Sequence, residues 1–75
     1  MANAFILIST ELGSETDVMK ELKKIDETKE AHKVYGVYDI IARIEADTME
    51  NLKDVISLKV RRISMIRSTL TMMIM

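Results

Sequence analysis

The stretch Val34-Tyr35-Gly36-Val37-Tyr38-Asp39-Ile40-Ile41 lies at the middle of the chain and decides the fold. Aromatic and β-branched residues flank a glycine, and an aspartate precedes the second apolar run. This pattern is typical of a β-hairpin, in which one strand reaches Gly36, the chain turns within two or three residues and a second strand begins. On either side of the hairpin comes one helix-like segment and one outer strand, which indicates a plan repeated twice.

The composition limits what this chain can be. Its 75 residues predict a single domain, 1–75, whose own core is small enough that oligomerisation should add stability. There is no cysteine and only one histidine, His32, so the sequence offers no disulfide, thiolate metal site or histidine cluster. The net charge of −1 argues against binding nucleic acid through a basic face. Because neither a membrane-spanning run nor a signal segment is found, we expect a cytoplasmic protein.

The first half of the chain predicts a strand, a helix and a second strand. Phe5 to Ile8 is a continuous apolar run, which favours a buried strand over Asn3–Thr10. Ser14, followed by Asp17, predicts the start of a helix over about 14–26, with apolar residues at helical spacing. Residues 27–30 then form a polar connection, and 31–35 form a polar edge strand.

The second half repeats this order. Residues 38–46 alternate in a pattern that predicts a strand with one dry face. Asp47 and Glu50 predict the start of a second helix, which runs to about Val60 or Arg62. Arg67–Ile74 forms the last strand.

The fold class is therefore α+β, a ferredoxin-like β-α-β-β-α-β sandwich with a four-stranded antiparallel sheet and both helices on one face. The helix-covered face is predicted to carry Ile6, Ile8, Ile40, Ala42, Ile44, Leu70, Met72 and Ile74. The opposite face then carries Phe5, Leu7, Ile41, Met73 and Met75. An apolar face of this kind marks an interaction surface, so we expect two copies to pair sheet to sheet.

Two short motifs resemble the effector-binding (RAM) domain of the Lrp/AsnC transcriptional regulators. The hairpin quoted above resembles the Gly-x-Tyr-Asp hairpin of that domain, and Ile66-Arg67-Ser68-Thr69-Leu70-Thr71 resembles its last strand. The resemblance covers the whole chain. It implies a stand-alone effector-binding module without the helix-turn-helix domain of full family members. At Met65 the family usually has glycine, so the turn into the last strand departs from the pattern.

The resemblance also implies a site and partners. It implies dimers that assemble into closed higher oligomers, with an amino-acid effector bound between dimers, and co-assembly with a full-length Lrp/AsnC-type regulator. The ligand-binding positions that match are Tyr35, Gly36, Val37, Tyr38 and Asp39, with Ser68, Thr69 and Thr71 as further candidates from the last strand. No metal, cofactor, nucleic acid or membrane is implied.

The chemistry of the hairpin suits an amino acid, but each residue also has a structural interpretation. Asp39 can accept from an ammonium group, and amides exposed near Gly36 can bind a carboxylate. Equally, Asp39 can order the hairpin by accepting from backbone amides, and the tyrosines can be interface residues. Thr69 and Thr71 are also good strand formers.

Catalysis finds little support, because no nucleophile-base set or phosphate-binding loop is present, so we expect no enzyme. An adaptor oligomer without a ligand and a small ferredoxin-like dimeric enzyme remain the alternatives to amino-acid sensing in transcription regulation.

Overall fold

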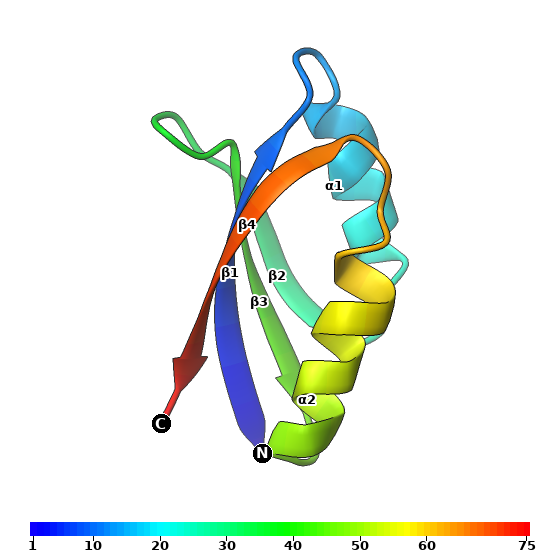
Figure 1. Cartoon of the computed structure of the whole chain (residues 1–75), viewed down its shortest axis with the longest axis vertical. Helices are drawn as coiled ribbons and strands as arrows, with labels where there is room; N and C mark the ends of the chain where they lie inside the picture. The colour runs from blue at the N-terminus through cyan, green and yellow to red at the C-terminus, as the bar shows by residue number, and fades with distance from the viewer.

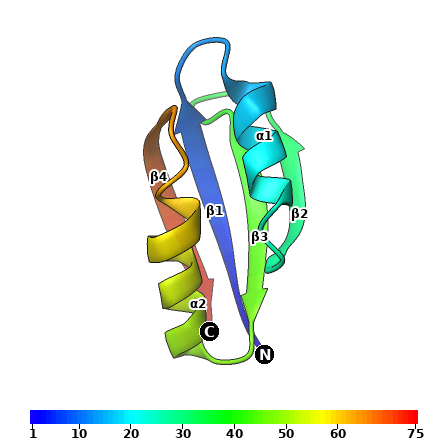
Figure 2. The same ribbon diagram turned by 90° about the vertical axis from the view of Figure 1, so that its right-hand side faces the viewer.

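The computed structural model describes residues 1–75 and shows one sheet with two helices packed against it (Figure 1). The strands pair antiparallel in the order β2-β3-β1-β4, and both helices lie on the same face (Figure 2). The predicted ferredoxin-like fold is therefore confirmed. The elements in chain order are β1 (Ala2–Thr10), α1 (Glu15–Lys23), β2 (Thr28–Lys33), β3 (Ile40–Ala46), α2 (Met49–Val55), its π-helical continuation η1 (Ile56–Val60) and β4 (Ile66–Ile74).

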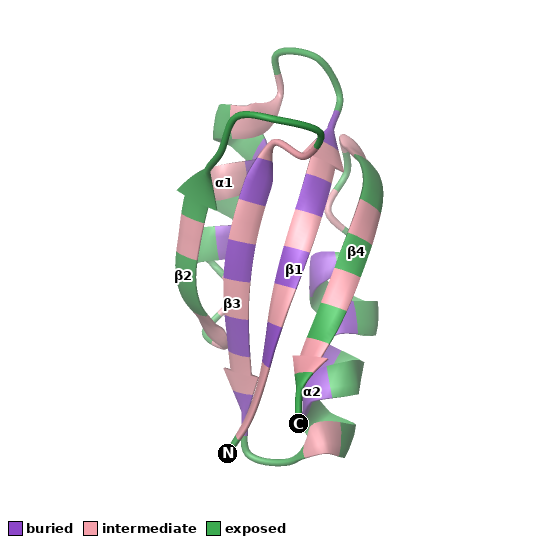
Figure 3. Cartoon of the chain, turned by 90° about the vertical axis from the view of Figure 1, so that its left-hand side faces the viewer, coloured by how far each residue is buried: buried purple, intermediate pink, exposed green.

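The core lies between the two central strands and the helices. Along β1 and β3 every second residue is buried, and Figure 3 shows this alternation. Ile6 and Ile44 are fully buried on the helix-covered face and belong to one core cluster with Val18 of α1 and Leu52 of α2. Successive side chains of a strand point to opposite faces of the sheet, so every second residue of β1 and β3 faces the helices, and nearly all of these residues are apolar.

The β2 strand begins earlier than predicted. Residues 28–30, expected as a polar connection, belong to β2 and pair with β3, with a register irregularity between Thr28 and Glu30. Charged side chains are tolerated here because β2 is an edge strand and most of its residues are exposed. The charged residues Lys29 and Glu30 thus belong to a strand that the hydrophobic pattern of the sequence does not predict.

The helix starts differ from the capping predictions. Ser14 precedes α1, but its side chain caps no backbone amide. At α2 the cap is Thr48, whose hydroxyl accepts from the Asn51 amide at 3.0 Å, and not Asp47. The second helix does reach Val60, although its last turn is π-helical.

The predicted orientation of β4 is wrong. In the register of β1 and β4, Leu7 lies opposite Leu70 and Phe5 lies opposite Met72. Residues directly opposite one another in a sheet share a face, so apolar residues of β4 join the face away from the helices. These residues are Leu70, Met72 and Ile74, all 46–47% exposed, whereas Met73 pairs with Ala4 on the helix-covered side. Met75 lies beyond β4 and is exposed.

Candidate functional site

The β2–β3 connection is a loop that projects from the end of the sheet. It spans residues 34–39, closed by a hydrogen bond from the Val34 amide to the Asp39 carbonyl at 2.8 Å. It is therefore longer than the predicted turn of two or three residues. Gly36 has φ +154°, a conformation that glycine adopts at little cost. Tyr35 and Val37 are almost completely exposed, and Figure 1 shows the loop in green at the upper left.

Asp39 ties this loop to the central strand. Its Oδ2 accepts from the Thr10 amide at 2.9 Å and lies 3.4 Å from the Thr10 hydroxyl. Its own amide donates to the Ile8 carbonyl at 2.9 Å. Thr10 is only 5% exposed, so the carboxylate satisfies a buried donor at the end of β1. Asp39 does accept from a backbone amide, as the structural interpretation predicts, but this amide is that of Thr10 in β1, 29 residues away, and not one within the hairpin.

A hollow of about 360 Å³ separates this loop from the start of α1. Of the predicted ligand-binding residues, Tyr35, Gly36 and Asp39 line it. The other lining residues were not among the candidates; they are Glu15, Thr16, Lys33 and Val34. Lys33 ends β2, and its ammonium donates to the Thr16 hydroxyl at 2.8 Å. In the sequence, Lys33 is a charged residue of a polar edge strand, which is equally typical of a surface lysine without a function. The sequence therefore does not identify Lys33 as a site residue.

The remaining candidates lie elsewhere. Val37 and Asp39 border a second hollow of about 230 Å³ together with Arg67. Tyr38 is half-buried and lines neither hollow. The candidates from the last strand are separate from the loop. Ser68 and Thr69 line a shallow hollow of about 150 Å³ beside two arginines, and Thr71 lies opposite Ile6 on the helix-covered side. Within one chain, Arg67 is the residue of the last-strand motif that shares a hollow with the hairpin, whereas the candidates Ser68, Thr69 and Thr71 do not.

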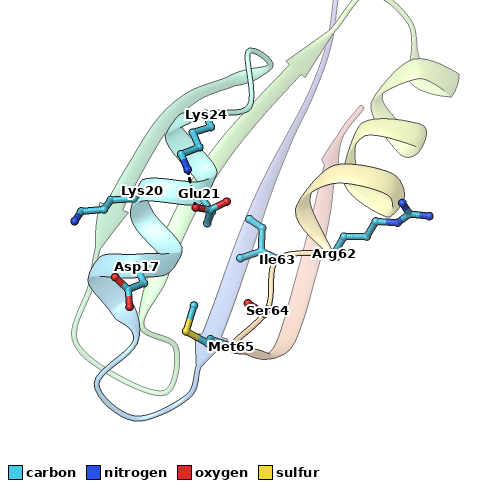
Figure 4. Close-up of a pocket in the computed structure, with 8 residues that line it drawn as sticks. All are labelled: Asp17, Lys20, Glu21, Lys24, Arg62, Ile63, Ser64 and Met65. Carbon is cyan, nitrogen blue, oxygen red and sulfur yellow. Dashed lines mark hydrogen bonds and ion pairs between the residues drawn. The ribbon is translucent and has the colours of Figure 1, made fainter.

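The largest hollow, about 440 Å³, lies between α1 and the connection from η1 to β4 (Figure 4). Among its charged groups, Lys24 pairs with Glu21 at 3.0 Å, and the side chains of Lys20 and Arg62 point away from the hollow. Met65, in the position where the family motif has glycine, has φ +72° and thus adopts the left-handed conformation without being glycine. Its side chain lines this hollow rather than the one at the hairpin.

The open face of the sheet has a polar part and an apolar part. Arg43 is the centre of the polar part: it donates to Glu30 at 2.7 Å, Glu45 at 3.1 Å and Asn3 at 2.8 Å. Hydrogen bonds from Arg43 and then from His32 lower the pKa of Glu30, and the bonds to Glu30 and Glu45 raise the pKa of Arg43. The apolar part lies mainly on the neighbouring strands β1 and β4. Its residues are Phe5, Leu7, Leu70, Met72 and Ile74, together with Ile41 of β3, which lies opposite Leu7 as predicted.

Two further properties concern metals and membranes. The structure contains no group of three or more His, Cys, Asp or Glu side chains arranged to hold a metal ion. Neither helix has the length and apolar character needed to cross a lipid bilayer.

Comparison with solved structures shows the same fold along the entire chain. The crystal structure of FFRP-DM1 is 43% identical, covers 100% of both chains and superposes with a TM-score of 0.95. The structure of E. coli AsnC is 25% identical with a TM-score of 0.91, and the match covers 99% of this chain and 50% of AsnC. A more distant structure shares the fold, the L-Met complex of the transcriptional regulator NMB0573 from Neisseria meningitidis, at 17% identity and a TM-score of 0.79, covering 99% of this chain and 49% of that one.

Sequence comparison agrees with the structural one. No curated protein sequence matches the chain significantly. The family model described as the Lrp/AsnC ligand binding domain, however, matches residues 3–75, nearly the whole chain. The chain therefore belongs to the Lrp/AsnC ligand-binding domain family.

Proposed function

We propose that this chain is an amino-acid-sensing module that assembles through the open face of its sheet and takes part in transcription regulation. The observation that carries the proposal is the hollow at the β2–β3 loop, which combines charged, hydroxyl and aromatic groups beside a glycine. Its volume of about 360 Å³ lies at the low end of the range typical of small-molecule sites. A protein of the same fold was solved with L-Met bound, which supports an amino acid as the ligand class.

Self-association follows from the one-sided cover of the sheet. The helices leave Leu70, Met72 and Ile74 about half exposed, next to Phe5 and Leu7 on the neighbouring strand. A contiguous apolar surface of this kind is costly in water and typical of an interface. A second copy, related by a two-fold axis, would bury the same residues in both chains. The Arg43 cluster then lies toward one side, where it keeps its internal partners.

The ligand is proposed to lie at a junction between dimers, because Tyr35 and Val37 leave the loop exposed and able to contact a neighbour. A ligand that contacts two dimers favours the assembled state, since binding shifts an equilibrium only through such differential contacts. Co-assembly with a full-length regulator would carry this response to transcription. The proposal assigns the chain no catalytic step and a cytoplasmic site of action.

Native mass spectrometry with and without a pool of the twenty common amino acids tests this function. The expected result is a closed assembly with an even number of chains that gains the mass of one amino acid for each junction. An even-numbered assembly that gains no mass contradicts sensing and favours an adaptor without a ligand. A monomer at micromolar concentration contradicts the assembly itself.

A further inference from the structure

The hollow at the β2–β3 loop contains two opposite charges that have no charged partner in the chain. The ammonium of Lys33 bonds only to the Thr16 hydroxyl, and no carboxylate lies within 4.0 Å of it. The carboxylate of Glu15 forms no hydrogen bond and no ion pair. By contrast, Lys24 and Lys59 each pair with a glutamate at 3.0–3.1 Å. The two groups at the loop therefore remain available to a ligand.

The fold brings these groups to the same hollow from different elements. Lys33 is the last residue of β2, and Glu15 is the first residue of α1. Figure 2 shows the first turn of α1 beside the end of β2. Both side chains line the hollow, yet they form no ion pair with each other within 4.0 Å. A separated cation and anion on its walls match a ligand that itself carries an anion and a cation.

Other charged groups are less suitable for this role. One oxygen of Asp39 is committed to Thr10, where it satisfies a buried amide. Arg67 does not line this hollow but two others, and it lies 3.9 Å from Glu11. In the hollow at the β2–β3 loop, Lys33 and Glu15 are thus the charged residues whose side chains have no ionic partner and satisfy no buried group.

We infer that Lys33, with the Thr16 hydroxyl, binds the carboxylate of an α-amino acid and that Glu15 binds its ammonium group. This inference rests on the proposed function and specifies which residues select a zwitterion. Charge-assisted hydrogen bonds are short and strong, so removing one charge from either partner weakens binding measurably. The ligand side chain is left to face Tyr35 and the neighbouring copy, so these two charges select the amino-acid class and not its identity.

The test measures binding by isothermal titration calorimetry on the assembled protein. The probes are the amino acid that the pool experiment identifies, its carboxamide and its N-acetyl derivative. Wild type is expected to bind the free amino acid roughly tenfold or more tightly than either derivative, the range for a hydrogen bond to a charged group. Lys33→Met is expected to lose the preference over the carboxamide while keeping the preference over the N-acetyl form. Glu15→Gln is expected to show the reverse.

Lys53→Met is the matched control, because Lys53 is an exposed lysine of α2 with no hydrogen bond or ion pair. Native mass spectra of all variants should show the wild-type assembly, which separates loss of binding from loss of structure. If Lys33→Met keeps wild-type affinity and the wild-type preference for the free acid, the inference is wrong and the proposed function stands. If wild type itself binds no amino acid, the proposed function fails and takes the inference with it.

Discussion

Replacing Asp39 with alanine should destabilise the protein, whether or not any ligand is present. The change removes the acceptor of a 2.9 Å hydrogen bond from the Thr10 amide, and Thr10 is 5% exposed. A buried donor left without a partner costs about 1–3 kcal/mol, and the second contact at 3.4 Å adds little. We therefore expect a loss of about 2 kcal/mol, out of roughly 4–11 kcal/mol for a domain of this size. The midpoint of thermal unfolding should fall by about 8–16 °C.

The assay is urea unfolding followed by circular dichroism at one fixed protein concentration, because self-association stabilises by mass action. Asp39→Asn keeps an acceptor oxygen but loses the charge, so its loss should be about half as large. Asp54→Ala is the control, since Asp54 is exposed on α2 and makes no contact of this kind. An Asp39→Ala protein within about 0.5 kcal/mol of wild type would show that this bond does not hold the end of β1.

The same bond changes how a ligand experiment at Asp39 must be interpreted. Weak amino-acid binding by Asp39→Ala would also follow from a displaced loop, since the Asp39 carboxylate joins the β2–β3 loop to β1. Lys33 and Glu15 give a cleaner test because no bond between strands depends on them.

Three other perturbations test separate features. Met72→Asp places a charge on the apolar part of the open face and should convert the assembly to monomers, as measured by size-exclusion chromatography with light scattering. Leu58→Asp, at an exposed position of η1, should leave the assembly intact, and equal masses of the two variants would contradict the interface. Leu52→Ala leaves a cavity at a fully buried position and should lower the free energy of unfolding in urea by about 2–5 kcal/mol. The same change at the fully exposed Leu12 should leave this free energy almost unchanged, and a small decrease for Leu52→Ala would mean that neighbouring side chains fill the cavity. The pKa of Glu30 is lowered from its ordinary value of 4.5, so the stability that Glu30 contributes is present above pH 4.5 and is lost as the pH falls through the lowered pKa. Glu30→Gln should therefore flatten the dependence of stability on pH below 4.5, and an unchanged dependence would show that the Arg43 cluster does not contribute.

The sequence predicts the fold well where periodicity and burial coincide. Phe5–Ile8 and residues 40–46 are strands buried between neighbours, and Leu52 to Val60 form one helical stripe. The prediction fails where both faces of a strand carry suitable residues. In β4 an apolar series alternates with a series of threonines and Met73, and either series can face the core. Which one does so depends on register with β1, a property of pairing across more than sixty residues.

The site is less accessible from sequence than the fold. The hairpin motif leads to Tyr35, Gly36 and Asp39, which the structure places at one hollow. Glu15 and Thr16 enter that hollow only because α1 starts beside the end of β2. The Asp39–Thr10 bond likewise joins residues 29 apart. Local patterns contain no record of such contacts, which arise from the packing of whole elements.

The strand order has a consequence for the synthesis of the chain. The strand made first, β1, occupies the middle of the sheet, and one of its two neighbours is β4, the strand made last. At about 5–20 residues per second the ribosome takes roughly 3–13 s to add the 65 or so residues that separate Phe5 from its partner Met72. During that time the apolar strand lacks one complete edge, so the native sheet cannot close before β4 has left the ribosome. The domain must therefore fold after translation of β4, and the nascent chain must keep Phe5–Ile8 from associating with other polypeptides until then.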